Sequence, residues 1–287
     1  MKKTQISAST SSLAGYSLKD ATETIRRLGF ASAGVLGQVD SRNALGVLPG
    51  YAWHYLEANG MNAVRDTVSG FEIVTIHAPY EDLQLASYSP DIRSLSQIII
   101  QKSTEAAPYL HAANVTFHLE PPRYFDVAST WDLLMAAGRE VARYAKIFAV
   151  RVAVETSPLV STDLLVRLLD EIDAPNLGAT LDVGAVARCT AAERSATPEV
   201  IEQVNQAIVA SVAQLGERLR HVHLHDVMPE GWCDHRAIGT GILDFARIVS
   251  ALDAAGYSGA VEIELEEEER EEALWNSRLA LEHYTTG

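Results

Sequence analysis

The sequence has few cysteines and no long apolar run. Its two cysteines, Cys189 and Cys233, form no CxxC spacing and imply no disulfide framework, so we expect a reducing compartment. No apolar stretch approaches the ~20 residues of a membrane-spanning helix. The N-terminal stretch MKKTQISASTSSLAG also lacks the apolar core that a signal peptide needs. We therefore expect a cytoplasmic protein that does not associate with membranes.

Positive charge is also scarce. The chain has 23 Lys and Arg against 38 Asp and Glu, which gives a formal net charge of −15. A phosphate backbone is bound by a basic surface, so we expect no nucleic-acid partner. The composition, 47% hydrophobic and 21% charged, is typical of a folded globular protein.

The apolar residues are grouped into short runs that alternate with amphipathic stretches. The candidate strands are residues 4–10, 32–37, 73–78, 114–119, 150–155, 178–183, 220–226 and 260–265. Helix start signals lie between them: Ser17 with Asp20 at a capping-box spacing, and Ser or Thr directly before Pro90 and Pro198. Strands that alternate with helices indicate parallel βαβ units. Eight such units predict a (β/α)8 TIM barrel as one domain over residues 1–287, with an open doubly wound sheet as the alternative.

The predicted strands also show which side chains face the barrel axis. Alternate residues of a strand point to opposite sides, and the small or polar residues of five runs fall on one side. These pairs are Thr75 with His77, Thr116 with His118, Ala153 with Glu155, Thr180 with Asp182, and Glu262 with Glu264. We expect them to face the axis, so that the last polar residue of each run reaches the C-terminal mouth, where such barrels carry out chemistry.

The stretch 221–241, HVHLHDVMPEGWCDHRAIGTG, holds four of the nine histidines. Together with the other strand ends it predicts six polar residues at one rim: His77, His118, Glu155, Asp182, His223 and Glu264. Neighbouring carboxylates repel one another unless a cation compensates them. Carboxylate and imidazole without thiolate suit Mn²⁺, Mg²⁺, Co²⁺ or Zn²⁺. Alternatively, each residue is an isolated polar group that caps a loop or forms a salt bridge.

Across nearly its whole length the sequence resembles the xylose isomerase-like barrel superfamily, which includes sugar isomerases and epimerases, inositol-pathway enzymes and endonuclease IV. The stretches VAVET, TLDVG, VHLHD, HRAIGTGILD and GYSGAVEIE occur in that family's order and spacing. The resemblance implies one divalent metal ion, Mn²⁺, Co²⁺, Mg²⁺ or Zn²⁺, bound by Glu155, Asp182, His223 and Glu264. Glu262 is the weaker candidate for the last ligand.

The resemblance also suggests substrate-binding residues. His77 and His118 are candidates for substrate contact, with a structural role or a second metal as alternatives. His235 and Arg236 are further candidates, although His235 could serve a loop hydrogen bond and Arg236 could pair with Asp234 or Glu230. Asp226 is expected to orient a ligand histidine.

The function implied is a sugar isomerase or epimerase that acts on a sugar, keto-sugar or cyclitol through a metal-stabilised enediolate. Glu155 and Glu264 are the candidate acid and base, and a homodimer is a candidate assembly. The sequence departs from the family at Ala185, where a histidine is usual. That departure keeps open a metal-dependent lyase or dehydratase acting on an oxidised sugar or glycoside. An endonuclease IV-like phosphodiesterase and a metal-free scaffold protein are the further alternatives.

Overall fold

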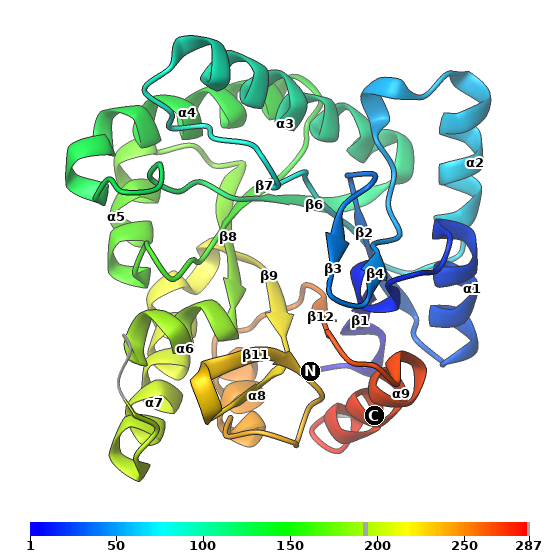
Figure 1. The fold of residues 1–287 in the computed structure, drawn as a ribbon, viewed down its shortest axis with the longest axis vertical. Helices are drawn as coiled ribbons and strands as arrows, with labels where there is room; N and C mark the ends of the chain where they lie inside the picture. Colours follow the sequence, from blue (N-terminus) through cyan, green and yellow to red (C-terminus); the bar gives the residue numbers. More distant parts are fainter. Residues whose placement is uncertain (192–194, 286–287) are drawn as a thin grey trace.

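The computed structural model describes residues 1–191 and 195–285. Within them, eight parallel strands close into a barrel with helices around its outside (Figure 1). The barrel order is β1-β12-β9-β8-β7-β6-β5-β2. The strands are β1 (Ile6–Ser9), β2 (Ser32–Leu36), β5 (Val74–His77), β6 (Ala112–Phe117), β7 (Val152–Glu155), β8 (Leu177–Asp182), β9 (Leu219–Leu224) and β12 (Val261–Ile263). Each lies within or overlaps one of the predicted runs, so the (β/α)8 prediction is confirmed.

Helices follow the strands along the chain. They are α1 (Leu18–Arg27), α2 (Ala58–Val68), α3 (Pro90–Leu110), α4 (Val127–Ile147), α5 (Thr162–Ile172), α6 (Val183–Ala191), α7 (Pro198–Leu215), α8 (Phe245–Ala254) and α9 (Arg270–Glu282). Single 3-10 turns occur at Lys3–Gln5, Thr10–Leu13, Trp53–Tyr55, Gly216–Arg218 and Glu230–Trp232. Two small antiparallel sheets lie in the loops, β3 (Arg42–Asn43) with β4 (Gly46–Val47) and β10 (Asp226–Met228) with β11 (Cys233–Arg236).

The predicted start signals define the helix ends. The Ser17 hydroxyl accepts a hydrogen bond from the Asp20 amide at 3.1 Å, which caps α1. Thr197 caps α7 in the same way, by accepting from the Val200 amide at 3.4 Å. α1 is followed by Gly29 with φ +84°, a conformation that glycine adopts without strain.

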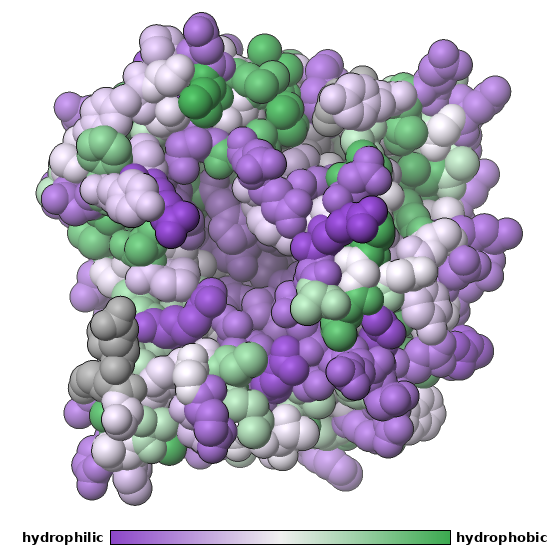
Figure 2. Space-filling view, in the orientation of Figure 1, coloured by the Kyte–Doolittle hydropathy of each residue, from purple (hydrophilic) through white to green (hydrophobic). Residues whose placement is uncertain are grey.

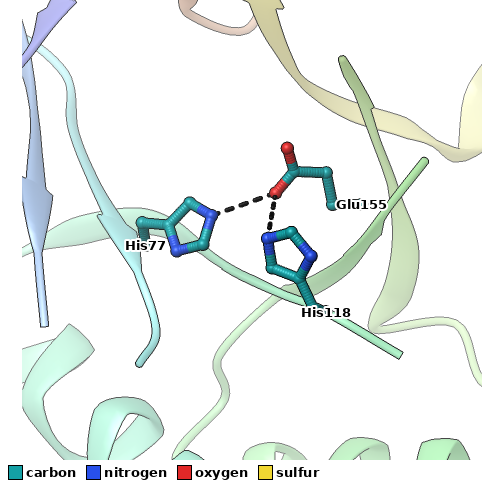
Figure 3. A group of neighbouring side chains, drawn as sticks. All are labelled: His77, His118 and Glu155. Atoms are coloured by element: carbon teal, nitrogen blue, oxygen red, sulfur yellow. Dashed lines mark hydrogen bonds and ion pairs between the residues drawn. The ribbon is translucent and has the colours of Figure 1, made fainter. Parts of the chain in front are cut away.

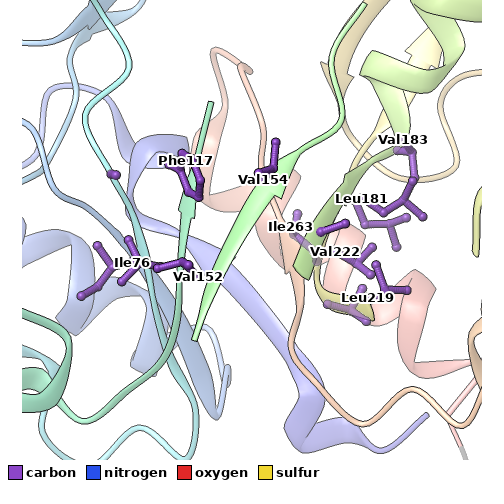
Figure 4. Packing of buried hydrophobic residues seen from close by; sticks show 14 of the residues in the cluster. Ile76, Phe117, Val152, Val154, Leu181, Val183, Leu219, Val222 and Ile263 are labelled. Atoms are coloured by element: carbon purple, nitrogen blue, oxygen red, sulfur yellow. The ribbon is translucent and has the colours of Figure 1, made fainter. Parts of the chain in front are cut away.

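The outer wall of the barrel is apolar. Ile76, Phe117, Val154, Leu181 and Ile263 are buried on the side of the strands that faces the helices (Figure 4). Burying one such side chain contributes roughly 1.5–3 kcal/mol. This layer therefore supplies the barrel with much of its stability.

The inside of the barrel is polar, as the alternation of residues predicts. The Thr116 and Thr180 hydroxyls lie 2.8 Å apart, across the interior. Thr75 donates to Glu262 Oε2 at 2.6 Å, and His221 Nε2 lies 3.0 Å from the same oxygen. Gly34 of β2 makes room for this carboxylate, because a Cβ at that position would overlap Glu262.

Candidate active site

A cavity of about 540 Å³ opens at the C-terminal mouth of the barrel. On the face drawn in Figure 2, hydrophilic side chains surround a hollow near its centre. The polar lining includes His77, His118, Glu155, Asp182, Arg188, His235 and Glu264. The volume of the cavity falls within the ~300–1,000 Å³ range of small-molecule sites. Five of the six predicted rim residues therefore line a space of the right size for a small substrate, and His223 lies behind them against Glu155.

The four predicted metal ligands come from four consecutive strands of the barrel. Their order, β12-β9-β8-β7, places His223 and Asp182 between the two glutamates. His223 Nδ1 lies 3.0 Å from Glu155 Oε1, 3.3 Å from Glu264 Oε2 and 3.9 Å from Asp182 Oδ2. Three carboxylates thus face one imidazole nitrogen, and the ligand atoms of Glu155, Asp182 and His223 lie within 4.8 Å of one another.

The charges of this group influence one another strongly. Burial opposes the charged form of His223, but the Glu155 and Glu264 carboxylates outweigh it and raise the pKa of His223 well above its ordinary value. Burial would also raise the pKa of Glu155, yet His223 and His118 hold it well below its usual range. Burial, followed by the charge of Glu155, raises the pKa of Asp182 to about 6. Burial likewise opposes the charged form of His118, but Glu155 and Glu120 raise the pKa of His118 to about 10. In the metal-free protein, imidazolium groups therefore balance part of the charge that a cation would otherwise balance.

His77 and His118 converge on Glu155 from β5 and from the residue that follows β6 (Figure 3). Their Nε2 atoms lie 3.0 and 3.1 Å from Glu155 Oε2. His77 Nδ1 lies 2.8 Å from the carbonyl oxygen of Ala78, so the His77 ring is held at both nitrogens. Both histidines also line the cavity, where a substrate could reach them.

The two remaining predicted residues lie in different places. His235 lines the cavity, with Nδ1 3.3 Å from Asp234 Oδ1. Arg236 instead points to Glu267, with a distance of 3.5 Å from Nη1 to Oε2, and its Nε donates to the Asp234 carbonyl at 3.0 Å. Arg236 thus forms a salt bridge, but its partner is Glu267 rather than the carboxylate of Asp234 or Glu230.

Among the cavity residues that the sequence did not single out, Ser11 and Arg188 contact acidic side chains of the site. The Ser11 hydroxyl, just after β1, donates to Glu264 Oε1 at 3.0 Å. Arg188 of α6 lies on the cavity wall with Nε 3.0 Å from Asp234 Oδ2. Ser11 could have been found from the sequence, because it lies directly after the first predicted strand, residues 4–10. Arg188 carried no such signal, because its place depends on how α6 packs.

Asp226 has a different role from the one expected. It does not orient a histidine but accepts from the backbone amides of Val227, Gly239, Gly241 and Leu243 at 2.8–3.1 Å. Asp226 therefore fixes the loop that contains Gly239, Thr240 and Gly241. A Cβ at Gly241 would overlap the Val227 carbonyl and the Asp226 carboxylate, which explains that glycine.

A family model described as xylose isomerase-like TIM barrel matches residues 24–282. The chain is 26% identical over 226 residues to an uncharacterized protein of Methanocaldococcus jannaschii, which covers 74% of this chain and 71% of that relative. A second uncharacterized protein of the same organism is 26% identical over 179 residues, or 60% of this chain and 62% of the relative. The predicted family resemblance is confirmed.

Several solved structures share the fold. A D-tagatose 3-epimerase-like protein is 22% identical with a TM-score of 0.74, covering 98% of this chain and 96% of that one. D-Psicose 3-epimerase from Clostridium cellulolyticum H10 is 15% identical with a TM-score of 0.74, at 98% coverage of both chains. The 3-keto-D-glucoside 4-epimerase from E. coli is 15% identical with a TM-score of 0.72, covering 97% and 99%. In the described part of the chain, no helix has both the length and the apolar character of a membrane span.

Proposed function

The chain belongs to the xylose isomerase-like TIM barrel family, and we propose that it is a divalent-metal-dependent isomerase or epimerase of a sugar, keto-sugar or cyclitol. The observation that carries this proposal is the convergence of Glu155, Asp182 and Glu264 on His223 Nδ1 beside an open cavity. The sugar epimerases that share the fold support the substrate class.

A divalent ion suits this donor set. Three carboxylates and one imidazole, all from rigid strand ends, offer oxygen and nitrogen ligands without sulfur, which favours Mn²⁺, Mg²⁺, Co²⁺ or Zn²⁺. Glu155, Asp182, His223 and Glu264 would hold the ion. When bound, it supplies a positive charge that holds adjacent carbonyl and hydroxyl oxygens and stabilises the enediolate formed on proton loss.

The two glutamates are suited to move the proton. Glu155 on β7 and Glu264 after β12 are separated by β8 and β9 in the barrel, so they approach the substrate from different sides. Each directs one oxygen toward His223. The second oxygen of Glu264 accepts from Ser11, and that of Glu155 lies against His77 and His118. An acid or base needs an oxygen that is not committed to the metal, and each glutamate has one.

The substrate would be oriented by the cavity histidines. His118 and His235 can donate to substrate oxygens from the cavity wall. Both nitrogens of His77 are already engaged, so His77 would contact the substrate after releasing Glu155. Removal of a proton by one glutamate and its return by the other inverts the carbon, which is epimerisation. If one group performs both steps, the product is the aldose–ketose isomer.

The test uses metal-loaded protein in D₂O with a panel of ketoses, 3-keto-glucosides and keto-cyclitols, followed by NMR. We expect metal-dependent loss of the C–H signal beside the carbonyl, abolished in Glu264→Gln. The products distinguish an epimer from an isomer. A protein that binds no divalent ion after repletion with all four candidate metals would overturn the proposal.

A second candidate is a lyase or dehydratase on an oxidised sugar or glycoside. It is favoured by Ala185, which lines the cavity at the position where the family usually has a histidine. Proton removal would be the same, but a substituent on the next carbon would then leave. The NMR experiment identifies this outcome directly, because an unsaturated product appears instead of an epimer.

A further inference from the structure

His225 lies behind the cavity wall and is fully buried. Within the described residues, neither of its ring nitrogens has a hydrogen-bond partner. Buried polar atoms are nearly always paired, and those without protein partners often bind water or an ion. The unpaired imidazole of His225 therefore indicates a binding place for a water molecule or an ion beside this side chain.

The surroundings of His225 offer other metal-ligand atoms. Its Nε2 lies 3.9 Å from Asp182 Oδ1, whereas His223 Nδ1 is 3.9 Å from the other oxygen, Asp182 Oδ2. The His225 ring also stacks on His235, with centroids 4.2 Å apart and planes at 21°. Asp182, His225 and His235 each have a ligand atom within 4.8 Å of the other two. Asp182 thus stands between two separate groups of donors.

His235 is held in the manner of a metal ligand. Its Nδ1 lies 3.3 Å from Asp234 Oδ1, and Arg188 in turn holds Asp234 at 3.0 Å. Carboxylates commonly orient metal-binding histidines in this way. His235 Nε2 lies 4.0 Å from Glu264 Oε2, which is beyond hydrogen-bond distance and leaves this nitrogen open to a metal ion. His235 also has φ +58°, a conformation that side-chain-bearing residues rarely adopt and that is often found at functional sites.

The start of α6 leaves space for this arrangement. A Cβ at Gly184 would overlap His225 Nε2 and would also meet the Asp234 side chain. The next residue, Ala185, has a small side chain and donates its amide to Asp182 Oδ1 at 2.6 Å. The residues at 184 and 185 are therefore small where the imidazole of His225 enters from β9.

We propose that Asp182, His225 and His235 form a second divalent-cation site, next to the site of the proposed function and bridged to it by Asp182. Two imidazoles and one carboxylate favour Zn²⁺ or Co²⁺ over Mg²⁺. Since Asp182 and His235 line the cavity, this cation presents a second positive charge to an oxygen-rich substrate. The inference rests on these side chains and does not depend on the proposed reaction, although the two sites share Asp182.

The experiment measures zinc bound to the full chain at equilibrium, after chelator treatment and removal of any affinity tag. We expect about two equivalents of Zn²⁺ in the wild type and about one in His225→Gln. Glu264→Gln, which weakens the first site, should keep the equivalent that His225 binds. In the cobalt-loaded protein, His225→Gln should remove one set of visible absorption bands.

Two further variants make the result decisive. Gly184→Ala leaves every ligand in place but fills the space of the His225 imidazole, so it should also lose one equivalent. His77→Gln alters the other histidine pair near Glu155 and should retain both. Circular dichroism shows whether each variant is folded.

Two results would overturn the second site. One is a wild type that binds a single equivalent which His225→Gln retains, and this would leave the proposed function standing. The other is a second equivalent that disappears in His77→Gln but persists in His225→Gln. If the wild type binds no ion at all, both proposals fail.

Discussion

Two layers inside the barrel use the same residue types in different ways. In the lower layer, Glu262 is matched by one donor hydroxyl and one imidazole, those of Thr75 and His221. In the mouth layer, two residues further along the chain, Glu264 and two other carboxylates converge on one nitrogen of His223. The lower carboxylate has partners of its own, whereas the upper carboxylates crowd around one point, and His77 and His118 contact Glu155 from the other side.

The two layers differ in whether their carboxylates serve folding or ligand binding. A carboxylate that is buried with its own partners contributes to a defined interior. Carboxylates that converge on one point repel one another, and a cation bound at that point relieves the repulsion. Glu262 and Glu264 lie on the same face of one strand, so depth in the barrel, rather than residue type, separates the two roles.

The largest expected effect is a difference in metal affinity between variants of these two glutamates. Glu264→Gln should weaken binding of the first divalent ion by ~100-fold or more, because it removes a proposed ligand, whereas Glu262→Gln should stay within the ~10–100-fold range of outer partners or below it. Isothermal titration with Mn²⁺ measures both. Equal losses in the two variants would contradict the distinction between the layers.

For folding stability, we expect the lower-layer glutamate to matter more than the mouth-layer glutamate. Glu262→Gln should lower the free energy of unfolding of the metal-free protein by ~1–3 kcal/mol, because it disturbs a buried hydrogen-bonded group. Urea denaturation after chelation measures this change. Thr75→Val is the matched variant, since it removes the other side of the 2.6 Å bond. No loss in either variant would show that the lower layer does not stabilise the barrel.

Asp182→Asn should raise the free energy of unfolding of the metal-free protein, in contrast to Glu262→Gln. The pKa of Asp182 is raised to about 6 by burial and by the charge of Glu155, so its ionised form destabilises the metal-free fold at neutral pH. The variant should therefore be more stable than the wild type by ~1–2 kcal/mol at pH 7. Between pH 6 and its unfolded pKa of ~3.9 the native wild type holds this proton, so the difference should shrink as pH falls through that window. An Asn variant that is less stable at pH 7 would contradict this balance of charges.

The smallest effect is a proton released on metal binding. Glu155 and Glu264 outweigh the effect of burial and raise the pKa of His223 well above its ordinary value, so the metal-free protein holds a proton there at pH 7. A metal ion displaces it, and affinity should fall by up to about tenfold per unit of decreasing pH. Titrations in buffers of different ionisation enthalpy count the proton. Binding without proton release would mean that His223 is not the ligand.

Most of the fold could be predicted from the sequence because the strands alternate so regularly. Once eight parallel strands close, their ends must meet at one mouth, which brings His77, His118, Glu155, Asp182, His223 and Glu264 together. Local alternation and closure therefore determine these positions.

Loop paths depend on tertiary contacts and could not be predicted. Arg236 points to Glu267, and Asp226 binds four backbone amides of the following loop. Arg188 reaches the cavity only because α6 packs beside β8 and β10. The positions of Arg188 and Arg236 follow from packing against other elements of the fold, and that of Asp226 follows from the path of the loop after it.

The most direct test of the central claim is the binding of a divalent ion to the mouth layer. Chelator-treated wild type, Glu264→Gln and Glu262→Gln are titrated with Mn²⁺ under identical conditions, and bound ion is measured by electron paramagnetic resonance. We predict saturable binding in the wild type and in Glu262→Gln, and binding of the first ion weakened by ~100-fold or more in Glu264→Gln. A wild type without saturable binding, or a Glu264→Gln variant that binds equally well, would contradict the account.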